Sequence, residues 1–145
     1  MTIKGEYVPS PSDWVRDQVE AIEAAGDTRA VQLMDRPLVL LTMLGVSGKV
    51  RKVPLMRVEH DGSYAAVASK GGAPENPKWY ANLKKNPVLD LMDGTDTFAV
   101  EARELSGTER EEWWARCVAA YPPYAEYQTK TDRQIPVLLL EPVTL

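Results

Sequence analysis

The stretch LVLLTMLGVSGKVRKVPLMRVEHDGSYAAVAS, residues 38–69, decides the fold of this chain. Residues 38–44 are a continuous apolar run whose length is typical of a buried strand. The tight GVSG connection that follows, residues 45–48, leads into a second extended segment over 50–59. An HDG turn then closes a hairpin onto a third strand over 63–69. Three consecutive strands joined by short turns predict antiparallel pairing.

Before this stretch, residues 12–25 have the pattern of an amphipathic helix. Ser12 is its predicted N-cap, and Trp14, Val19 and Ile22 fall near one face. The polar face is acidic, which argues against binding to an anionic lipid surface, although peripheral contact with a membrane stays open.

After this stretch, the sequence predicts further helices and strands. Asn76 is the predicted N-cap of a helix that ends near Asn86. Thr108 and Glu111 have capping-box spacing for a helix that Pro122-Pro123 terminates. The predicted strands cover residues 88–92, 97–104 and 135–140. Because hairpins join the strands, we expect a mainly β, α+β fold, an antiparallel sheet or barrel with helices packed outside it.

Composition narrows the class of protein. The 145 residues are 44% hydrophobic and 26% charged, which predicts one globular domain over 1–145. No apolar run is long enough to span a membrane, and no signal peptide is recognisable, so we expect a cytoplasmic protein. The single cysteine, Cys117, and the single histidine, His60, argue against a disulfide framework, a metal site and a Ser-His-Asp triad.

The net charge of −4 is unevenly distributed. Residues 49–85 carry eight bases against three acids, whereas residues 86–145 carry eleven acids against five bases. A basic middle in an acidic chain favours a local anionic ligand over a nucleic-acid surface. Solvated lysines on ordinary strands and helices explain the charge pattern equally well.

Two segments have residue types suited to binding a small molecule. In Ser69-Lys70-Gly71-Gly72, adjacent glycines let backbone N–H groups approach an anion. Tyr121, Tyr124 and Tyr127 recur at three-residue intervals, and a phenol can both stack on a ring and donate a hydrogen bond. A plain glycine turn and ordinary core packing are the competing interpretations. There is no GxGxxG or P-loop motif for a nucleotide.

Several motifs together resemble one family. In order, the chain contains RKVPLM (51–56), ASKGG (68–72), NP (76–77), WYANL (79–83), YPPYAEYQ (121–128), TDRQIPV (131–137) and EP (141–142). This series, which covers roughly residues 37–142, resembles the deazaflavin-dependent nitroreductases of actinobacteria. The resemblance implies a split β-barrel over 37–142, preceded by the helix within 1–26, and reduced coenzyme F420 as the cofactor.

The resemblance also implies where ligands bind. The implied coenzyme-binding residues are Val46, Ser47, Lys49, Arg51, Lys52, Val53, Pro54, Leu55, Met56, Val67, Ala68, Ser69, Lys70, Lys78, Trp79, Tyr80, Ala81, Asn82 and Tyr124. The implied catalytic residues, which line the acceptor pocket, are Ser69, Tyr121, Tyr124 and Tyr127. The basic middle of the chain agrees with a polyanionic coenzyme tail.

We therefore expect an oxidoreductase that passes a hydride from reduced F420 to an electron-poor small molecule: an activated enone or lactone, a quinone, or a nitroaromatic. The resemblance leans toward a monomer. The turn over 45–48 departs from the family, because it is one residue shorter than usual and lacks a base. An FMN-binding oxidoreductase of the same fold and a non-catalytic deazaflavin carrier are the alternatives.

Overall fold

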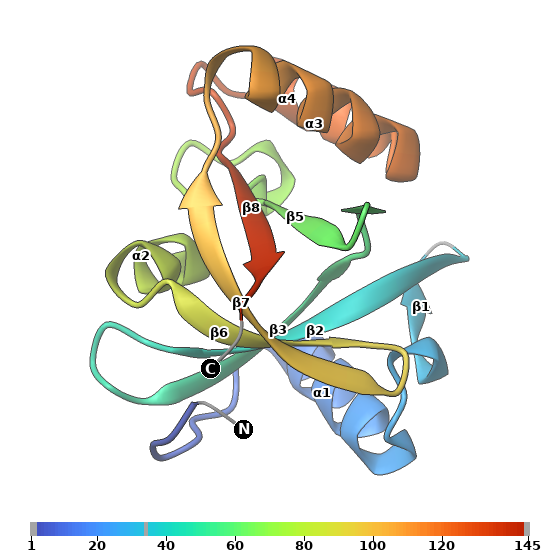
Figure 1. Ribbon diagram of the computed structural model, residues 1–145, viewed down its shortest axis with the longest axis vertical. Helices are drawn as coiled ribbons and strands as arrows, with labels where there is room; N and C mark the ends of the chain where they lie inside the picture. Colours follow the sequence, from blue (N-terminus) through green and yellow to red (C-terminus); the bar gives the residue numbers. More distant parts are fainter. Residues whose placement is uncertain (1–2, 34, 144–145) are drawn as a thin grey trace.

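The computed structural model describes residues 3–33 and 35–143. Figure 1 shows its helices and strands in their order along the chain. The helices are α1 (Asp13–Ala25), η1 (Thr28–Ala30), η2 (Lys70–Gly72), α2 (Lys78–Lys85), α3 (Gly107–Ala120) and α4 (Pro123–Thr129). The strands are β1 (Gln32–Leu33), β2 (Arg36–Leu44), β3 (Val50–Met56), β4 (Glu59–His60), β5 (Ser63–Val67), β6 (Val88–Asp93), β7 (Asp96–Glu104) and β8 (Val137–Pro142).

The strands form one antiparallel sheet, as predicted. The sheet order is β1-β2-β6-β7-β8-β5-β4, and β3 pairs with β2. The hairpins β2–β3 and β6–β7 have the registers that the short turns require, with Leu44 opposite Val50 and Asp93 opposite Asp96.

The sheet curls because the segment Arg57–Val58 bonds both to β2 and to β5, which lie in different parts of the sheet. The Arg57 N–H donates to the Pro37 carbonyl of β2 at 3.0 Å, and the next carbonyl, that of Val58, accepts from Ala65 of β5 at 3.0 Å. The predicted single strand over 50–59 is therefore divided into β3 and β4, since the chain changes partner at Arg57–Val58. This closure at one end confirms the split-barrel class.

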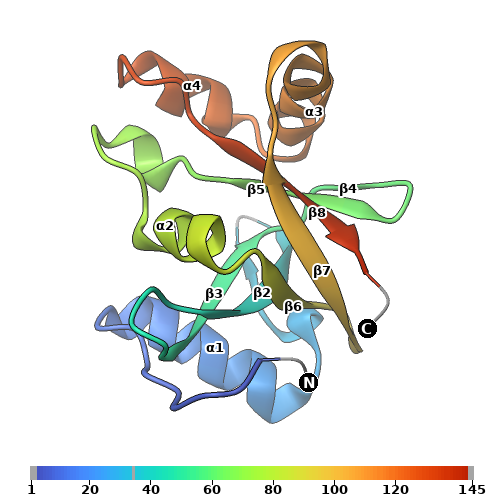
Figure 2. The same cartoon turned by 60° about the vertical axis from the view of Figure 1, so that its left-hand side comes forward.

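Alternation along the strands separates two faces. One face fills the barrel with side chains such as Val39, Leu41, Ala66, Leu91 and Leu138, all nearly inaccessible to solvent. The other face is covered by helices. Figures 1 and 2 show α3 and α4 packed together over the β5–β8 side and α1 beneath β2 and β3, with α2 beside the barrel.

The first helix begins as predicted. The Ser12 hydroxyl accepts from the Val15 N–H at 3.4 Å, and Val19 and Ile22 are buried against Leu40 of β2. Trp14, which was predicted on the apolar face, is instead 56% exposed, because it lies in the first turn of α1, before the buried positions that begin at Gln18.

Two predicted helix caps are wrong. Pro77, not Asn76, is the N-cap of α2, and no side chain caps that helix. Helix α3 has Ser106 at its N-cap, again without a side-chain hydrogen bond, so the Thr108–Glu111 capping box does not form. In the first case a tertiary partner competes for the capping group, since the Asn76 Oδ1 accepts from Arg133 at 2.7 Å.

Candidate active site

Strand β3 has one edge whose polar groups point away from β2. Because the Arg57 N–H donates to β2, the backbone N–H and C=O groups of the odd-numbered residues of β3 point toward β2. Those of the even-numbered residues point toward the opposite edge. At one end of that edge Val50 exchanges two hydrogen bonds with the N-terminal segment, at 2.8 and 3.0 Å. At the other end Val58 bonds to β5.

Between these paired ends, Lys52, Pro54 and Met56 present their backbone to an edge without a strand partner in residues 3–33 and 35–143. Pro54 has no N–H to leave unpaired, and proline is typical of such edges. The edge therefore offers the N–H groups of Lys52 and Met56 together with three carbonyls. An open backbone edge of this kind can bind a flat partner that carries hydrogen-bonding groups.

Strand β5 presents the facing edge. The Ala68 N–H donates to Pro136 at 2.9 Å, toward β8, whereas the Ala65 N–H donates toward β4. Val67 has the same orientation as Ala65, and its backbone turns away from β8. We call the region between the edges of Lys52–Met56 and Val67 the split.

The side chains beside the split are apolar. Val53 and Leu55 pack against the barrel cluster that contains Trp79 of α2. Met56 and Val67 belong to the cluster under α3 and α4 that contains Tyr121 and Tyr124. The split thus lies between the barrel cluster and the cluster that contains the tyrosines.

The three tyrosines make mutual ring contacts but differ in their hydroxyl partners. The rings of Tyr121 and Tyr124 meet edge to face with centroids 4.9 Å apart, and the Tyr121 and Tyr127 hydroxyls lie 3.2 Å apart. No protein partner of the Tyr124 hydroxyl is found in the described part of the chain. Burial raises the pKa of Tyr124 well above its usual value, and the hydrogen bond to Tyr121 raises that of Tyr127 to about 12. Both phenols are therefore protonated donors at neutral pH.

The loop after β5 is a tight left-handed turn. Lys70, Gly71 and Gly72 all have positive φ, at 47°, 64° and 85°. A Cβ on Gly72 would lie 2.7 Å from the Tyr127 carbonyl oxygen, so glycine is required where the loop packs on α4. Ser69 is 8% exposed, and its hydroxyl has no recorded protein partner among the described residues.

Helix α2 holds the short turn over 45–48. The Asn82 Oδ1 accepts from the Val46 N–H at 3.1 Å, and the Lys85 Nζ donates to the Val46 carbonyl at 3.0 Å. The Val46 backbone donor is therefore already used by the protein, and Val46 and Ser47 are both exposed. A phosphate at this turn would rely on Ser47 and on neighbouring cations.

The basic middle of the chain is partly neutralised by ion pairs. Lys49 pairs with Glu6 at 2.7 Å, Lys70 pairs with Glu75 at 2.7 Å, and Lys52 pairs with Glu23 of α1. Arg51 is half-buried beside Gly45, and neither it nor exposed Lys78 has a recorded acidic partner among the residues described. An anionic ligand would therefore meet less competition from acidic groups at Arg51 and Lys78 than at the three paired lysines.

Helix α2 brings together the remaining predicted residues. Trp79 is buried in the barrel cluster, and the Tyr80 hydroxyl donates to Glu104 of β7. Together with burial, that bond raises the pKa of Tyr80 to about 12. Ala81 is exposed, so its side chain points away from the barrel.

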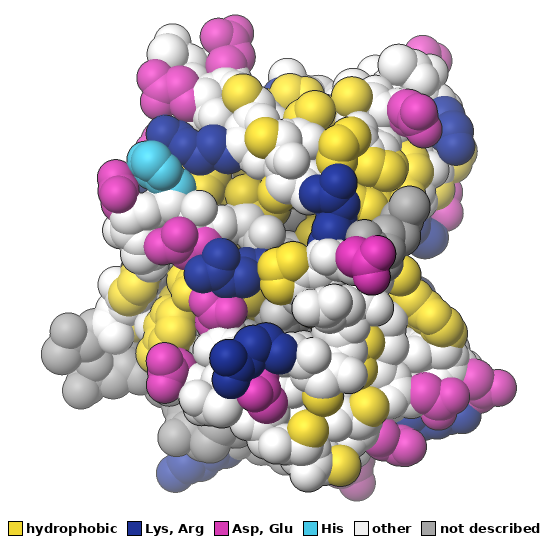
Figure 3. All heavy atoms as spheres, turned by 90° about the vertical axis from the view of Figure 1, so that its right-hand side faces the viewer, with side chains coloured by type: hydrophobic (Ala, Val, Ile, Leu, Met, Phe, Trp, Pro, Cys, Tyr) yellow, Lys and Arg dark blue, Asp and Glu magenta, His cyan; other side chains and the backbone are white. Residues whose placement is uncertain are grey.

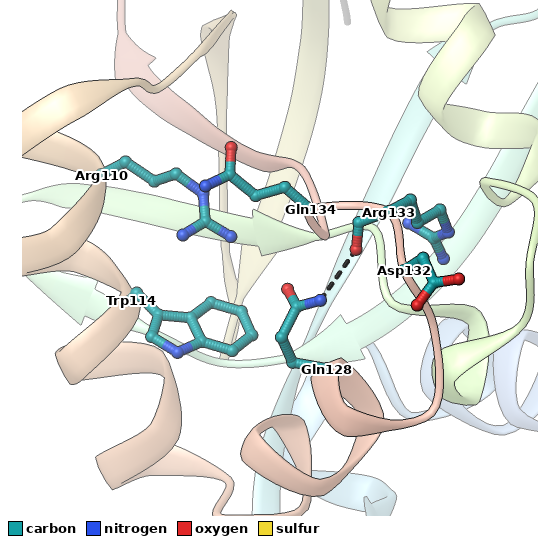
Figure 4. Close-up of a pocket in the computed structure, with 6 residues that line it drawn as sticks. All are labelled: Arg110, Trp114, Gln128, Asp132, Arg133 and Gln134. Carbon is teal, nitrogen blue, oxygen red and sulfur yellow. Dashed lines mark hydrogen bonds between the residues drawn. The ribbon is translucent and has the colours of Figure 1, made fainter.

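Two hollows lie outside the split. One, of about 390 Å³, is lined by residues that include Arg57 and Asp93. The other, of about 330 Å³, is drawn in Figure 4, where Arg110 and Trp114 of α3 face Gln128 of α4. On the face drawn in Figure 3, hydrophobic side chains lie in a recess between the half that carries α3 and α4 and the half below it.

Sequence reasoning gave no role to two side chains near the site. Arg133 donates to four acceptors around Ser69, and Gln128 bonds to the backbone on either side of Gln134. An arginine just before the apolar part of the TDRQIPV motif was the available signal. Its partners are about 60 residues away in sequence, so the signal could not identify them.

Comparison with known proteins identifies the class of this oxidoreductase. Residues 14–142 match the family model for F420H(2)-dependent quinone reductases. The Mycobacterium tuberculosis protein Rv3178, whose name places it among these reductases, is 40% identical over 96 residues, 66% of this chain and 81% of that protein.

Two solved structures are similar over most of their length. The F420-H2 dependent reductase FDR-A is 59% identical, with a TM-score of 0.70, over 77% of this chain and 99% of that one. A structure described as a domain-swapped dimer is 58% identical, with a TM-score of 0.72, over 91% of this chain and 100% of that one.

The chain therefore belongs to the F420H(2)-dependent quinone reductase family. It is an oxidoreductase with coenzyme F420 as its cofactor, and both expectations from the sequence are confirmed. None of the described helices has the length and hydrophobicity needed to cross a bilayer.

Proposed function

We propose that this chain reduces a quinone in the split, with the deazaflavin ring along the open edge of β3 and the acceptor between that ring and the tyrosines. The observation that carries the proposal is the edge of Lys52, Pro54 and Met56, whose backbone has no strand partner in the described part of the chain and adjoins the cluster containing Tyr124. An open edge supplies donors and acceptors in a fixed row, which suits the polar margin of a flat ring.

The residues around the split fit the coenzyme. Val53 and Leu55 offer apolar surface for the ring, and buried Trp79 excludes water from one end. Arg51 lies beside Gly45 of the 45–48 turn, has no recorded acidic partner among the described residues, and is the proposed partner of the phosphate or the oligoglutamate tail. Lys52 contributes its backbone only, because its side chain contacts Glu23 and lies 5.0 Å over the Tyr7 ring.

The reduced deazaflavin, when bound, supplies a hydride to the acceptor. The protein holds the acceptor in a fixed orientation against the ring, keeps water out and provides a proton donor at the acceptor oxygen. Tyr124 is the proposed donor, because it is 5% exposed, protonated, and without a recorded protein partner for its hydroxyl in the described residues. Ser69 is the proposed second donor, and Tyr121 and Tyr127 hold each other in place.

The test is a fluorescence titration of the purified protein with oxidised and reduced F420, with FMN in parallel. Saturable binding of the deazaflavin with no FMN binding supports the proposal. Preference for FMN would mean that the short 45–48 turn has changed the cofactor and that the proposal is wrong.

Turnover distinguishes an enzyme from a carrier. With reduced F420 and a naphthoquinone, an enone and a nitroaromatic offered separately under anaerobic conditions, we expect the quinone to be reduced fastest. Tight coenzyme binding without oxidation by any of the three would favour the carrier function instead.

A dimer is the assembly that we propose in place of the expected monomer. The support is the 58% identical neighbour described as a domain-swapped dimer. Light scattering coupled to size exclusion tests the proposal, and a monomer at all accessible concentrations would overturn it.

A further inference from the structure

The side chain of Arg133, from the TDRQIPV motif, donates its hydrogen bonds to the loop that follows β5. Its Nε donates to the Ala73 carbonyl at 3.0 Å, and its Nη2 donates to the Ser69 carbonyl at 2.9 Å. Its Nη1 donates to the Ala68 carbonyl at 3.2 Å and to the Asn76 Oδ1 at 2.7 Å. One guanidinium thus gathers four acceptors that span residues 68–76.

This loop needs an anchor because its backbone is unfavourable. Three consecutive residues, Lys70 to Gly72, have left-handed φ, and Lys70 carries a Cβ in that conformation. A loop of this shape leaves several carbonyls without helical or sheet partners. The planar guanidinium of an arginine, with its N–H donors in fixed directions, can bond to several such carbonyls at once.

The segment that carries Arg133 is itself hydrogen-bonded to α4, the helix of Tyr124 and Tyr127. The Gln128 Nε2 of α4 donates to the Arg133 carbonyl at 2.8 Å, and the Gln128 Oε1 accepts from the Ile135 N–H at 2.9 Å. In Figure 4 the Arg133 side chain points away from Arg110, Trp114 and Gln128, while its carbonyl faces Gln128. Loop 68–76, Arg133 and α4 therefore form one hydrogen-bonded unit, which the close contact between Gly72 and the Tyr127 backbone reinforces.

We propose that Arg133 is a positioning residue that fixes loop 68–76 against α4, so that Ser69 and the acceptor tyrosines keep one spacing beside the coenzyme. The inference rests on the proposed function, in which Ser69 is the second donor, and on the coenzyme contacts that the resemblance implies for residues 67–70. Small displacements between reacting groups have large effects on rate, and a change of about 1 Å can cost a hundredfold. The fork geometry matters more than the charge, because all four acceptors are used simultaneously.

The test compares Arg133→Lys with the matched variant Arg110→Lys. Arg110 is the control because it also donates to a carbonyl of the last segment, that of Ile135 at 2.6 Å, borders the same hollow and does not contact loop 68–76. For Arg133→Lys we expect faster amide exchange in 68–76 without coenzyme, an F420 Kd raised about tenfold, and slower hydride transfer in a single turnover. For Arg110→Lys we expect altered thermal stability only.

Unchanged loop exchange in Arg133→Lys, or equal changes in coenzyme Kd for both variants, would overturn the inference. If Arg133→Lys fails to fold, Arg133→Gln is measured in its place by the same two assays. Failure of the wild-type protein to bind F420 would instead overturn the proposed function, because the exchange measurement needs no coenzyme and still tests the anchor.

Discussion

Single side chains around the split differ in ways that their spacing does not reveal. Tyr121 and Tyr127 contact each other through their hydroxyls, whereas the Tyr124 hydroxyl has no recorded protein partner in the described chain. Arg51 has no recorded acidic partner among the described residues, whereas Lys49, Lys52 and Lys70 pair with acids. We therefore expect chemistry at this site to depend on a few of the residues that the motifs contain.

Replacing Tyr124 by Phe is expected to lower turnover of a quinone by about tenfold or more, because a proton donor at the acceptor oxygen is lost. The F420 Kd should change little, since the aromatic ring and its edge-to-face contacts are kept. Stopped-flow oxidation of the reduced coenzyme measures the rate. Tyr7→Phe, on the N-terminal segment, is the control, and equal rates in Tyr124→Phe and wild type would remove Tyr124 from this role.

Cys117 is expected to be unreactive in the folded protein. It is fully buried, and burial raises the pKa of its thiol to about 12, so almost no thiolate exists at neutral pH. A colourimetric thiol reagent should label it only after denaturation. Rapid labelling at pH 7 of the native protein, at the rate of a free thiol, would contradict this.

At the scale of elements, α2 substitutes for the base that the 45–48 turn lacks. Asn82 and Lys85 bond to both backbone groups of Val46, so the helix fixes the turn and brings an ammonium group to it. The sequence predicted the short turn and the helix separately. Their connection could not be predicted, because it depends on how α2 packs against the end of β2.

Asn82→Ala should weaken F420 binding roughly fivefold, because loss of a hydrogen bond worth about 1 kcal/mol releases the turn. Ser12→Ala is the stability-matched control. It removes the cap of α1, costs about 1 kcal/mol of unfolding free energy, and does not touch the turn. Fluorescence titration and chemical denaturation of both variants separate the two effects, and equal Kd values would show that Asn82 serves stability alone.

At the scale of the whole molecule, three tyrosines, one each on β5, α2 and α4, have raised pKa values. Burial and the hydrogen bond to Asp93 raise the pKa of Tyr64 to about 12, and Tyr80 and Tyr127 are raised to about the same value. An unfolded chain releases these protons near pH 10.

The folded state therefore binds more protons than the unfolded state between about pH 10 and 12, and its stability falls as the pH rises through that interval. Below pH 10 this contribution is fully present. Urea denaturation at pH 8, 10 and 11 should show a steep loss of stability above pH 10. A free energy of unfolding that stays constant from pH 8 to pH 11 would contradict the prediction.

The sequence by itself determined the strands, their antiparallel hairpins, the capped first helix and the motif series that identifies an F420-dependent reductase. These follow from local patterns: alternation, turn residues and apolar periodicity act over a few residues. It did not determine the change of partner at Arg57–Val58, the exposure of Trp14, or the competition that takes Asn76 from α2 to Arg133. The change of partner joins Arg57 to Pro37, 20 residues earlier, and the competition joins Asn76 to Arg133, 57 residues later. Only closure of the barrel brings such groups within hydrogen-bonding distance, and it also decides which edge of β3 is left open.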